Sequence, residues 1–89
     1  MPVVWIPSLL RELTNGQKSL SINGDTVRQV IENLERKYPG IKGRLCDGDR
    51  LHASISIVID GYTSTLKLRQ PLHESSEVHF VISISGGKS

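Results

Sequence analysis

The residues whose types and spacing best suit a chemical role stand at the end of the chain. A strand expected over residues 77–84 runs almost directly into Gly86 and Gly87, and only Lys88 and Ser89 follow. Glycine has no Cβ, so its backbone can approach a partner closely. A carboxyl group at Gly87 could therefore enter another enzyme's active site, be adenylated there and be converted by sulfide into a thiocarboxylate. Considered alone, the pair also fits an ordinary chain end, since roughly 0.5% of dipeptides are Gly-Gly by chance.

No other residues have the spacing of a catalytic or metal site. His52, His73 and His79 are far apart and no cysteine pair accompanies them, so we expect no metal ligands. The single cysteine, Cys46, has no histidine at a motif spacing, and we interpret it as a small buried hydrophobic residue. No serine lies in a nucleophile-elbow sequence. The sequence predicts a protein that is not an enzyme and holds no cofactor.

Size and charge predict one small domain. The 89 residues allow a single core. The 11 basic and 9 acidic residues are spread along the chain, unlike the basic stripe of a nucleic-acid-binding protein. The densest basic group, Lys42, Arg44 and Arg50, is interrupted by two aspartates and is interpreted as a solvated loop, with a phosphate-binding patch as the disfavoured alternative. Without a signal peptide, a long apolar run or a cysteine pair, we expect a cytoplasmic protein that binds neither nucleic acid nor membranes.

The hydrophobic pattern predicts the order strand, strand, helix, strand, short strand, strand. One helix must then cover one face of the sheet, because no other element can. This order predicts an α+β protein with the β-grasp (ubiquitin-like) roll, a mixed sheet of four to five strands and one main helix. We assign residues 1–85 to this domain and residues 86–89 to a flexible tail. The predicted strands cover residues 3–6, 18–22, 54–60, 65–68 and 77–84, and residues 41–49 are irregular, with room for a single helical turn.

The main helix is predicted from an apolar stripe that begins after residue 26. Thr26 can cap the helix, with Gln29 reaching back in a capping box, and Asp25 is the alternative cap. Pro39 ends it, because proline disfavours a helical conformation in the residue before it. The stripe consists of Val27, Val30, Ile31, Leu34 and Tyr38.

Strand alternation also predicts an exposed patch on the other face of the sheet. With Val4 and Ile6 packed under the helix, Trp5 points the opposite way, and so do Val58 and Val81. An exposed aromatic side chain ringed by small apolar ones is typical of a binding surface, where tryptophan is enriched. The alternative is that Trp5 is covered by the loop after the first strand or by the tail. Trp5, Val58 and Val81 are therefore a candidate partner interface.

Short segments distributed along nearly the whole chain carry a family resemblance. They are Ile6-Pro7-Ser8-Leu9-Leu10-Arg11, Gly16-Gln17-Lys18-Ser19, Gly24-Asp25-Thr26-Val27, Tyr38-Pro39-Gly40-Ile41, Arg44-Leu45, the strand over residues 55–61, and Gly86-Gly87. Through them the chain resembles the MoaD/ThiS family of ubiquitin-like sulfur carrier proteins. The segments IPSLLRELTNGQKS, GDT and RLHASISIVIDG look closest to the cysteine-biosynthesis carrier.

This resemblance implies a function and several partners. It implies a thiocarboxylate on Gly87, loaded by a ubiquitin-activating-type adenylyltransferase and used by a PLP-dependent cysteine synthase or by another acceptor in molybdopterin or thiamine synthesis. The family commonly ends at Gly-Gly, so the additional Lys88-Ser89 implies trimming by a zinc metallopeptidase. A second departure, Glu74-Ser75-Ser76-Glu77 in place of an acidic-glycine turn, is expected to change only the turn geometry.

Two other interpretations remain open. The first is a ubiquitin-like interaction module or protein modifier whose tail never carries sulfur. The second, which the spread of charge disfavours, is a nucleic-acid-binding β-grasp protein.

Overall fold

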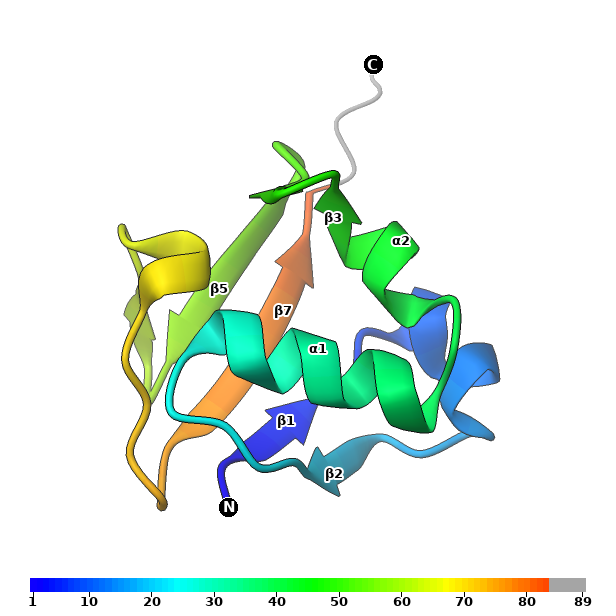
Figure 1. Ribbon diagram of the computed structural model, residues 1–89, viewed down its shortest axis with the longest axis horizontal. Coiled ribbons are helices and arrows are strands. Elements are labelled where there is room, and N and C mark those ends of the chain that lie inside the picture. The colour runs from blue at the N-terminus through cyan, green and yellow to red at the C-terminus, as the bar shows by residue number, and fades with distance from the viewer. Residues whose placement is uncertain (84–89) are drawn as a thin grey trace.

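A mixed five-stranded sheet forms the centre of the computed structural model, which describes residues 1–83. Its strand order is β2-β1-β7-β5-β6 (Figure 1). β1 and β7 run parallel, and the other neighbouring strands are antiparallel. The predicted β-grasp roll is confirmed. The strands are β1 (Val3–Trp5), β2 (Ser19–Ser21), β5 (Ile55–Ile59), β6 (Tyr62–Thr63) and β7 (Glu77–Ile82).

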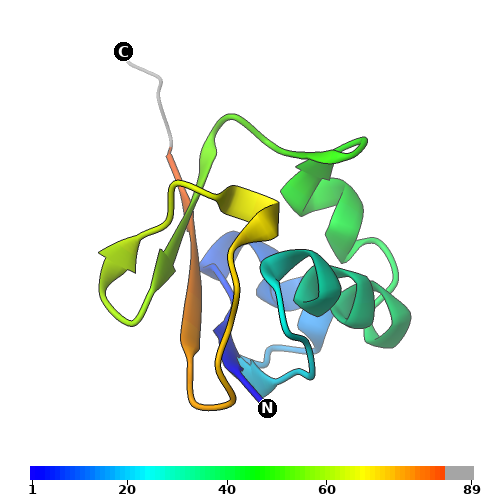
Figure 2. The same ribbon diagram turned by 60° about the vertical axis from the view of Figure 1, so that its left-hand side comes forward.

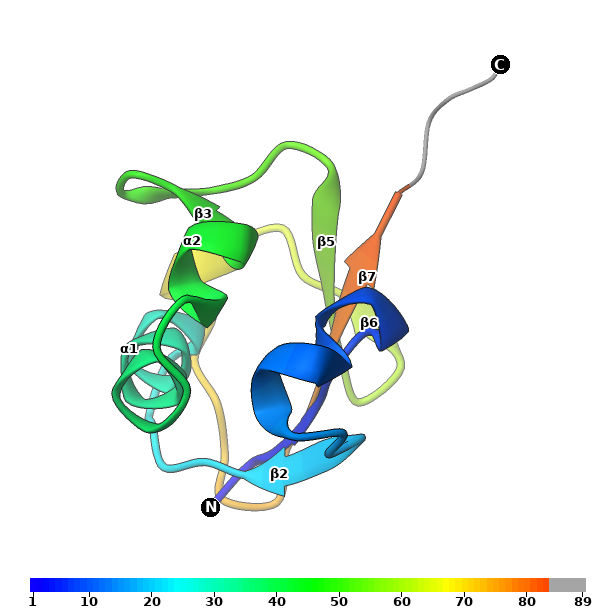
Figure 3. The ribbon, with the colours of Figure 1, turned by 90° about the vertical axis from the view of Figure 1, so that its right-hand side faces the viewer.

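Helix α1 (Val27–Lys37) lies across one face of this sheet, and α2 (Ile41–Leu45) lies on the same side (Figures 1 and 3). Within residues 1–83, no helix covers the opposite face (Figure 2). Strand alternation places Val4, Ile57 and Val78 under α1, and each is no more than 1% exposed. The buried side of α1 consists of Val27, Val30, Ile31 and Leu34, as the apolar stripe predicted.

The start of α1 follows the predicted capping arrangement with one change. The Gln29 N–H donates to Thr26 Oγ1 at 3.3 Å, so Thr26 is the cap. The Gln29 side chain accepts from the N–H of Asp25, at 2.7 Å, rather than from that of Thr26. A Cβ on Gly24 would lie 2.7 Å from Val30 Cγ2 and 2.8 Å from the Val30 nitrogen, so only glycine lets the chain pass this close to the helix.

The segment between α1 and β5 is more regular than the sequence pattern predicted. Residues 41–45 form α2, which buries Ile41 and Leu45 in the core. A two-stranded hairpin of β3 (Cys46–Asp47) and β4 (Arg50–Leu51) follows. The prediction that residues 41–49 are irregular was therefore wrong, apart from the single helical turn that it allowed. Five helical residues are too few to show a repeating apolar pattern.

The predicted short strand over residues 65–68 is also wrong. The edge strand is β6, and the chain then enters a 3₁₀ helix, η2 (Lys67–Arg69). Lys67 has a positive φ of 54°, which is incompatible with an extended strand, and Leu68 turns inward to 7% exposure. The connection between β1 and β2, expected as a loop, contains the 3₁₀ helix η1 (Ser8–Thr14), which buries Leu10.

The turn before β7 is held by a serine side chain. The His73 N–H donates to Ser76 Oγ at 2.8 Å, and Ser76 is 1% exposed. The described part of β7 ends at Ile82, whereas residue 84, the predicted strand end, lies outside the described residues.

Glu35 links the end of α1 to the start of α2. Its carboxylate accepts the Lys42 N–H at 2.9 Å and the Gly40 N–H at 3.1 Å from each oxygen. These two backbone hydrogen bonds, that from Lys42 first, lower the pKa of the Glu35 carboxyl. Because the pKa of Glu35 is lower in the folded state, its ionised carboxylate stabilises the fold. This contribution is complete above the unfolded pKa of about 4.3 and is lost as the pH falls through the folded pKa.

We therefore expect Glu35→Gln to lower the urea midpoint near neutral pH. The difference from the parent should narrow as the pH falls below about 4, because both proteins then carry a neutral side chain at this position. Urea unfolding at several pH values measures this. Glu12→Gln, a change at an exposed glutamate, is the matched control. A Glu35→Gln effect that does not vary with pH would contradict the charged hydrogen-bond argument.

Candidate functional site

The end of β7 is bound to the neighbouring strand up to the last described residue. Ile82 pairs with Ile55 of β5. The Ser83 N–H then donates to the Ser54 carbonyl at 2.7 Å. The point from which the chain continues toward Gly86 and Gly87 is thus held at the edge of the core. Gly86 and Gly87 themselves lie outside the described residues.

One row of side chains crosses the face of the sheet that faces away from α1. Directly paired residues project to the same face, and the strand register links this row from one sheet edge to the other. Trp5 and Val58 are the predicted interface residues within it, and both pair with His79 of β7. Val81 points the same way two residues further along β7 and pairs with Ser56. The row consists of Ser19, Trp5, His79, Val58 and Thr63.

The three predicted interface residues differ in exposure. Val81 is 45% exposed and Trp5 is 36% exposed, whereas Val58 is half-buried. The loop after Pro7 thus leaves over a third of the Trp5 surface accessible. The sequence prediction that these side chains share one face agrees with the register, and their role in binding a partner stays a prediction.

Trp5 is held in place by two residues that the sequence analysis did not associate with it. Its ring stacks on His79, with centroids 5.4 Å apart and planes inclined by 4°. Its Nε1–H donates to Glu77 Oε1 at 3.2 Å. His79 Nε2 lies 4.0 Å from the same carboxylate oxygen. We call Trp5, Glu77 and His79 the tryptophan cluster; it presents a large aromatic surface in a single orientation.

The sequence pattern indicates one part of this cluster and not the other. Glu77, His79 and Val81 occur at every second position of a strong strand pattern, which places them on one face. That Trp5 lies beside them depends on the parallel pairing of β1 with β7. Pattern alone does not specify this register.

The other chemically active side chains form no site in the described part of the chain. Residues 1–83 contain no group of three or more His, Cys, Asp or Glu placed to hold a metal ion. Cys46 is 6% exposed, and burial raises the pKa of its thiol, which disfavours the reactive thiolate. Its interpretation as a buried hydrophobic residue is confirmed. No helix in residues 1–83 has the length and apolar character needed to cross a membrane.

Comparison with known proteins agrees with this geometry. The model of the ThiS family matches residues 4–87. The chain therefore belongs to the ThiS family, and the match extends through Gly87, leaving Lys88 and Ser89 beyond it.

Individual relatives have the same fold. The sulfur carrier protein CysO of Mycobacterium tuberculosis is 45% identical over 60 residues, which cover 64% of each chain, slightly under two thirds of that relative's length. The crystal structure of the Amycolatopsis orientalis BexX/CysO complex contains a chain that superimposes with a TM-score of 0.91 at 28% identity, covering 98% of this chain and 100% of that one. The small archaeal modifier protein 1 of Methanosarcina acetivorans gives a TM-score of 0.81 at 30% identity, covering 97% of this chain and 95% of that one.

Proposed function

We propose that this protein is a cytoplasmic sulfur carrier that is adenylated and thiocarboxylated at Gly87 after removal of Lys88-Ser89. It donates this sulfur in cysteine biosynthesis or in a related pathway to molybdopterin or thiamine. The observation that carries the proposal is the family match through Gly87, the second residue of the terminal glycine pair. The protein acts as a co-substrate, and the catalytic groups belong to its partners.

The chemistry proceeds in three steps. A zinc metallopeptidase hydrolyses the Gly87–Lys88 peptide bond and frees the Gly87 carboxylate. A ubiquitin-activating-type adenylyltransferase lets this carboxylate attack the α-phosphorus of ATP, which releases pyrophosphate and leaves an acyl adenylate. A sulfide equivalent then attacks the acyl carbon and expels AMP, so the Gly87 carbonyl carries sulfur in place of one oxygen.

The acceptor step requires another protein. The thiocarboxylate sulfur would replace the leaving group on the β-carbon of an activated serine held by a PLP-dependent cysteine synthase, which forms a thioester between Gly87 and the new cysteine. Hydrolysis of that thioester would release cysteine and restore the Gly87 carboxylate. The PLP belongs to that enzyme. That the Amycolatopsis orientalis CysO has been crystallised in a complex with BexX supports a function carried out while bound to other proteins.

The tryptophan cluster with Val58 and Val81 is the proposed contact surface for the loading enzyme. Val81 lies on β7 two residues before Ser83, so this surface adjoins the last described residue of the chain. An enzyme that held this face would therefore be close to the segment that leads to Gly87.

The alternative function is that of a protein modifier. The similarity to the small archaeal modifier protein 1 of Methanosarcina acetivorans favours it. In that case the Gly87 carboxyl would be joined to an amine of a target protein and would never carry sulfur. Intact-mass measurement of the protein from its own cell distinguishes the two, because a thiocarboxylate replaces one oxygen by sulfur.

The first prediction concerns the last two residues. A chain that ends at Gly87 should support ATP–pyrophosphate exchange with the loading enzyme, because its carboxylate is free. The full-length chain should be inactive in this assay. Equal exchange with both chains would show that trimming is unnecessary.

The second prediction concerns the side chain at position 87. In the chain that ends there, Gly87→Val should sharply reduce loading, because a Cβ obstructs close approach of the backbone to the enzyme. Its unfolding midpoint should not change, since the buried core of the described residues lies between Val4 and Phe80. Gly43→Ala, where a Cβ meets no atom within 4 Å, is the matched glycine control. Normal loading of Gly87→Val would refute the close-approach argument.

The third prediction separates binding from folding at Trp5. Trp5→Ala should weaken binding to the loading enzyme by about 2 kcal/mol or more, as for a tryptophan at the centre of an interface. Its free energy of unfolding should change less than that of Ile57→Ala, a core truncation expected to cost roughly 2–5 kcal/mol. Titration calorimetry and urea unfolding measure the two quantities. A large loss of stability with unchanged affinity would assign Trp5 to the core instead.

A further inference from the structure

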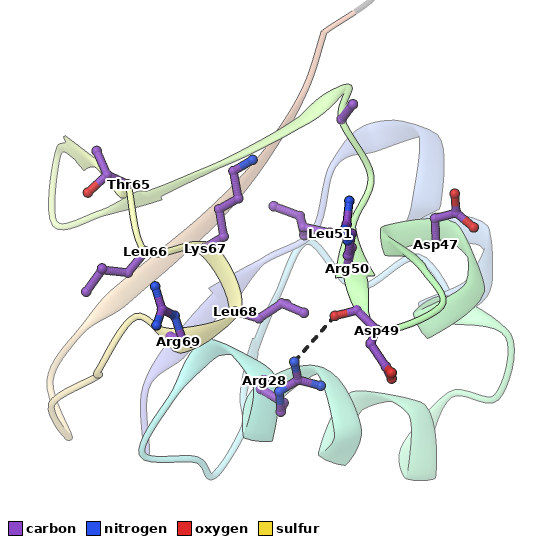
Figure 4. A pocket seen from close by; sticks show the side chains of 11 residues that line it. Arg28, Asp47, Asp49, Arg50, Leu51, Thr65, Leu66, Lys67, Leu68 and Arg69 are labelled. Atoms are coloured by element: carbon purple, nitrogen blue, oxygen red, sulfur yellow. Dashed lines mark hydrogen bonds between the residues drawn. The ribbon is translucent and has the colours of Figure 1, made fainter.

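A cavity of about 680 Å³ opens between the start of α1, the β3–β4 hairpin and η2, as Figure 4 shows. Four basic residues line it, one from α1, one from β4 and two from η2. None of the four forms a salt bridge with another residue of the described segment, residues 1–83. They are Arg28, Arg50, Lys67 and Arg69, and we call their surface the basic cavity.

The two acidic residues of the lining, Asp47 and Asp49, form no salt bridge with these four cations. Arg28 donates to the backbone carbonyl of Asp49, at 3.4 Å, and not to its carboxylate. Figure 4 shows the carboxylates of Asp47 and Asp49 pointing away from Leu68 and from the basic side chains around it. The lining therefore holds four cations against two carboxylates, so the net positive charge of the chain, +2, is matched by this one surface.

The basic cavity also has an apolar floor. Leu51 and Leu68 line it at 8% and 7% exposure, and Leu66 at its rim is 44% exposed. Lys67, which lies between Leu66 and Leu68 in the chain, has a left-handed φ of 54°. This conformation costs a residue with a Cβ about 1–2 kcal/mol. Such conformations concentrate at binding sites. Here Leu68 turns into the cavity, whereas the Leu66 side chain points away from it (Figure 4).

These features select one class of ligand. A single phosphate is bound best by donors that converge on one point, whereas Figure 4 shows the basic side chains around the cavity on different sides. A nucleic-acid base is bound best by stacking on an aromatic ring, and the lining contains none. An extended peptide with one apolar side chain between carboxylates matches both the leucine floor and the spread of cations.

We infer that the basic cavity binds an acidic peptide segment of a partner protein. An apolar side chain of that segment packs over Leu51 and Leu68. The flanking Asp or Glu carboxylates pair with the cations of the rim.

The basic cavity also lies close to Ser83, the last described residue, without overlapping the tryptophan cluster. Ala53 lines the cavity, and the next residue, Ser54, accepts the Ser83 N–H. The lining includes neither Trp5 nor Val58 nor Val81. A partner bound here leaves the outer sheet face free, so the inference stands whether or not Gly87 carries sulfur.

The test is a nuclear magnetic resonance titration of the ¹⁵N-labelled full chain. The probe is the end-blocked peptide Glu-Asp-Leu-Asp-Glu, and its uncharged counterpart is Gln-Asn-Leu-Asn-Gln. We expect the acidic peptide to shift the amides of Arg28, Ala53 and residues 66–69 and to bind about tenfold more tightly than its counterpart. Binding should weaken with added salt, since exposed charges are screened over about 10 Å at 0.1 M.

Paired variants of equal charge test the location. Arg28→Gln with Arg69→Gln should weaken binding about fivefold, as expected for two exposed ion pairs. Lys18→Gln with Arg36→Gln removes the same charge from exposed positions outside the lining and should have little effect. Replacing the central leucine of the acidic peptide by serine tests the apolar floor separately and leaves the protein unchanged. The serine peptide should bind more weakly, and equal binding would overturn the role of Leu51 and Leu68.

Three results would overturn the inference. An equal loss of affinity for the acidic peptide in the two double variants would mean that only the net charge of the protein determines binding. If the uncharged peptide bound as tightly as the acidic peptide, the cations of the rim would have no role in recognition. Inorganic phosphate that shifts the same amides and displaces the peptide at equal concentration would make the cavity a site for small anions.

Discussion

The structure depends on the parallel pairing of β1 with β7 at the centre of the sheet. This pairing joins the first and last strands of the described chain and buries Val4 opposite Val78, both at 0% exposure under α1. Parallel strands cannot be joined by a tight turn, so the intervening residues must cross over the sheet, and α1 does so. The same register sets Trp5 beside His79 on the outer face. One contact thus determines the core, the exposed row and the direction in which the chain end leaves.

Features encoded in local periodicity could be predicted from the sequence. The apolar stripe and polar cap of α1 lie within a dozen residues, and both appear in the structure, with the Gln29 side chain bound one residue earlier than expected. Residues 65–68 could not be assigned in this way. They alternate polar and apolar like a strand, but the left-handed Lys67 turns the chain so that Leu68 packs inward. Backbone conformation at a single non-glycine residue leaves no mark in the pattern.

The distribution of charge in the folded protein also could not be predicted from local sequence. Along the sequence, the densest basic group includes Lys42, but in the structure Lys42 pairs with Glu32 at 2.6 Å, and this hydrogen bond raises the pKa of the Lys42 ammonium. The basic cavity takes only Arg50 from that group and combines it with Arg28 and Arg69, which are far from it in the chain. Its positive charge arises from the packing of η2 and the β3–β4 hairpin beside α1. No window along the sequence contains it.

The position of β5 relates the outer face to the basic cavity. Its first residues pair with the end of β7, and Ser54 just before it holds Ser83. On one side of this junction Val81 continues the exposed sheet face, and on the other Ala53 leads into the basic cavity. The outer face and the basic cavity are the two surfaces through which we propose that this small domain binds larger partners. Because Val81 and Ala53 each lie within two residues of the hydrogen bond between Ser83 and Ser54, a partner bound at either surface would lie close to the last described residue.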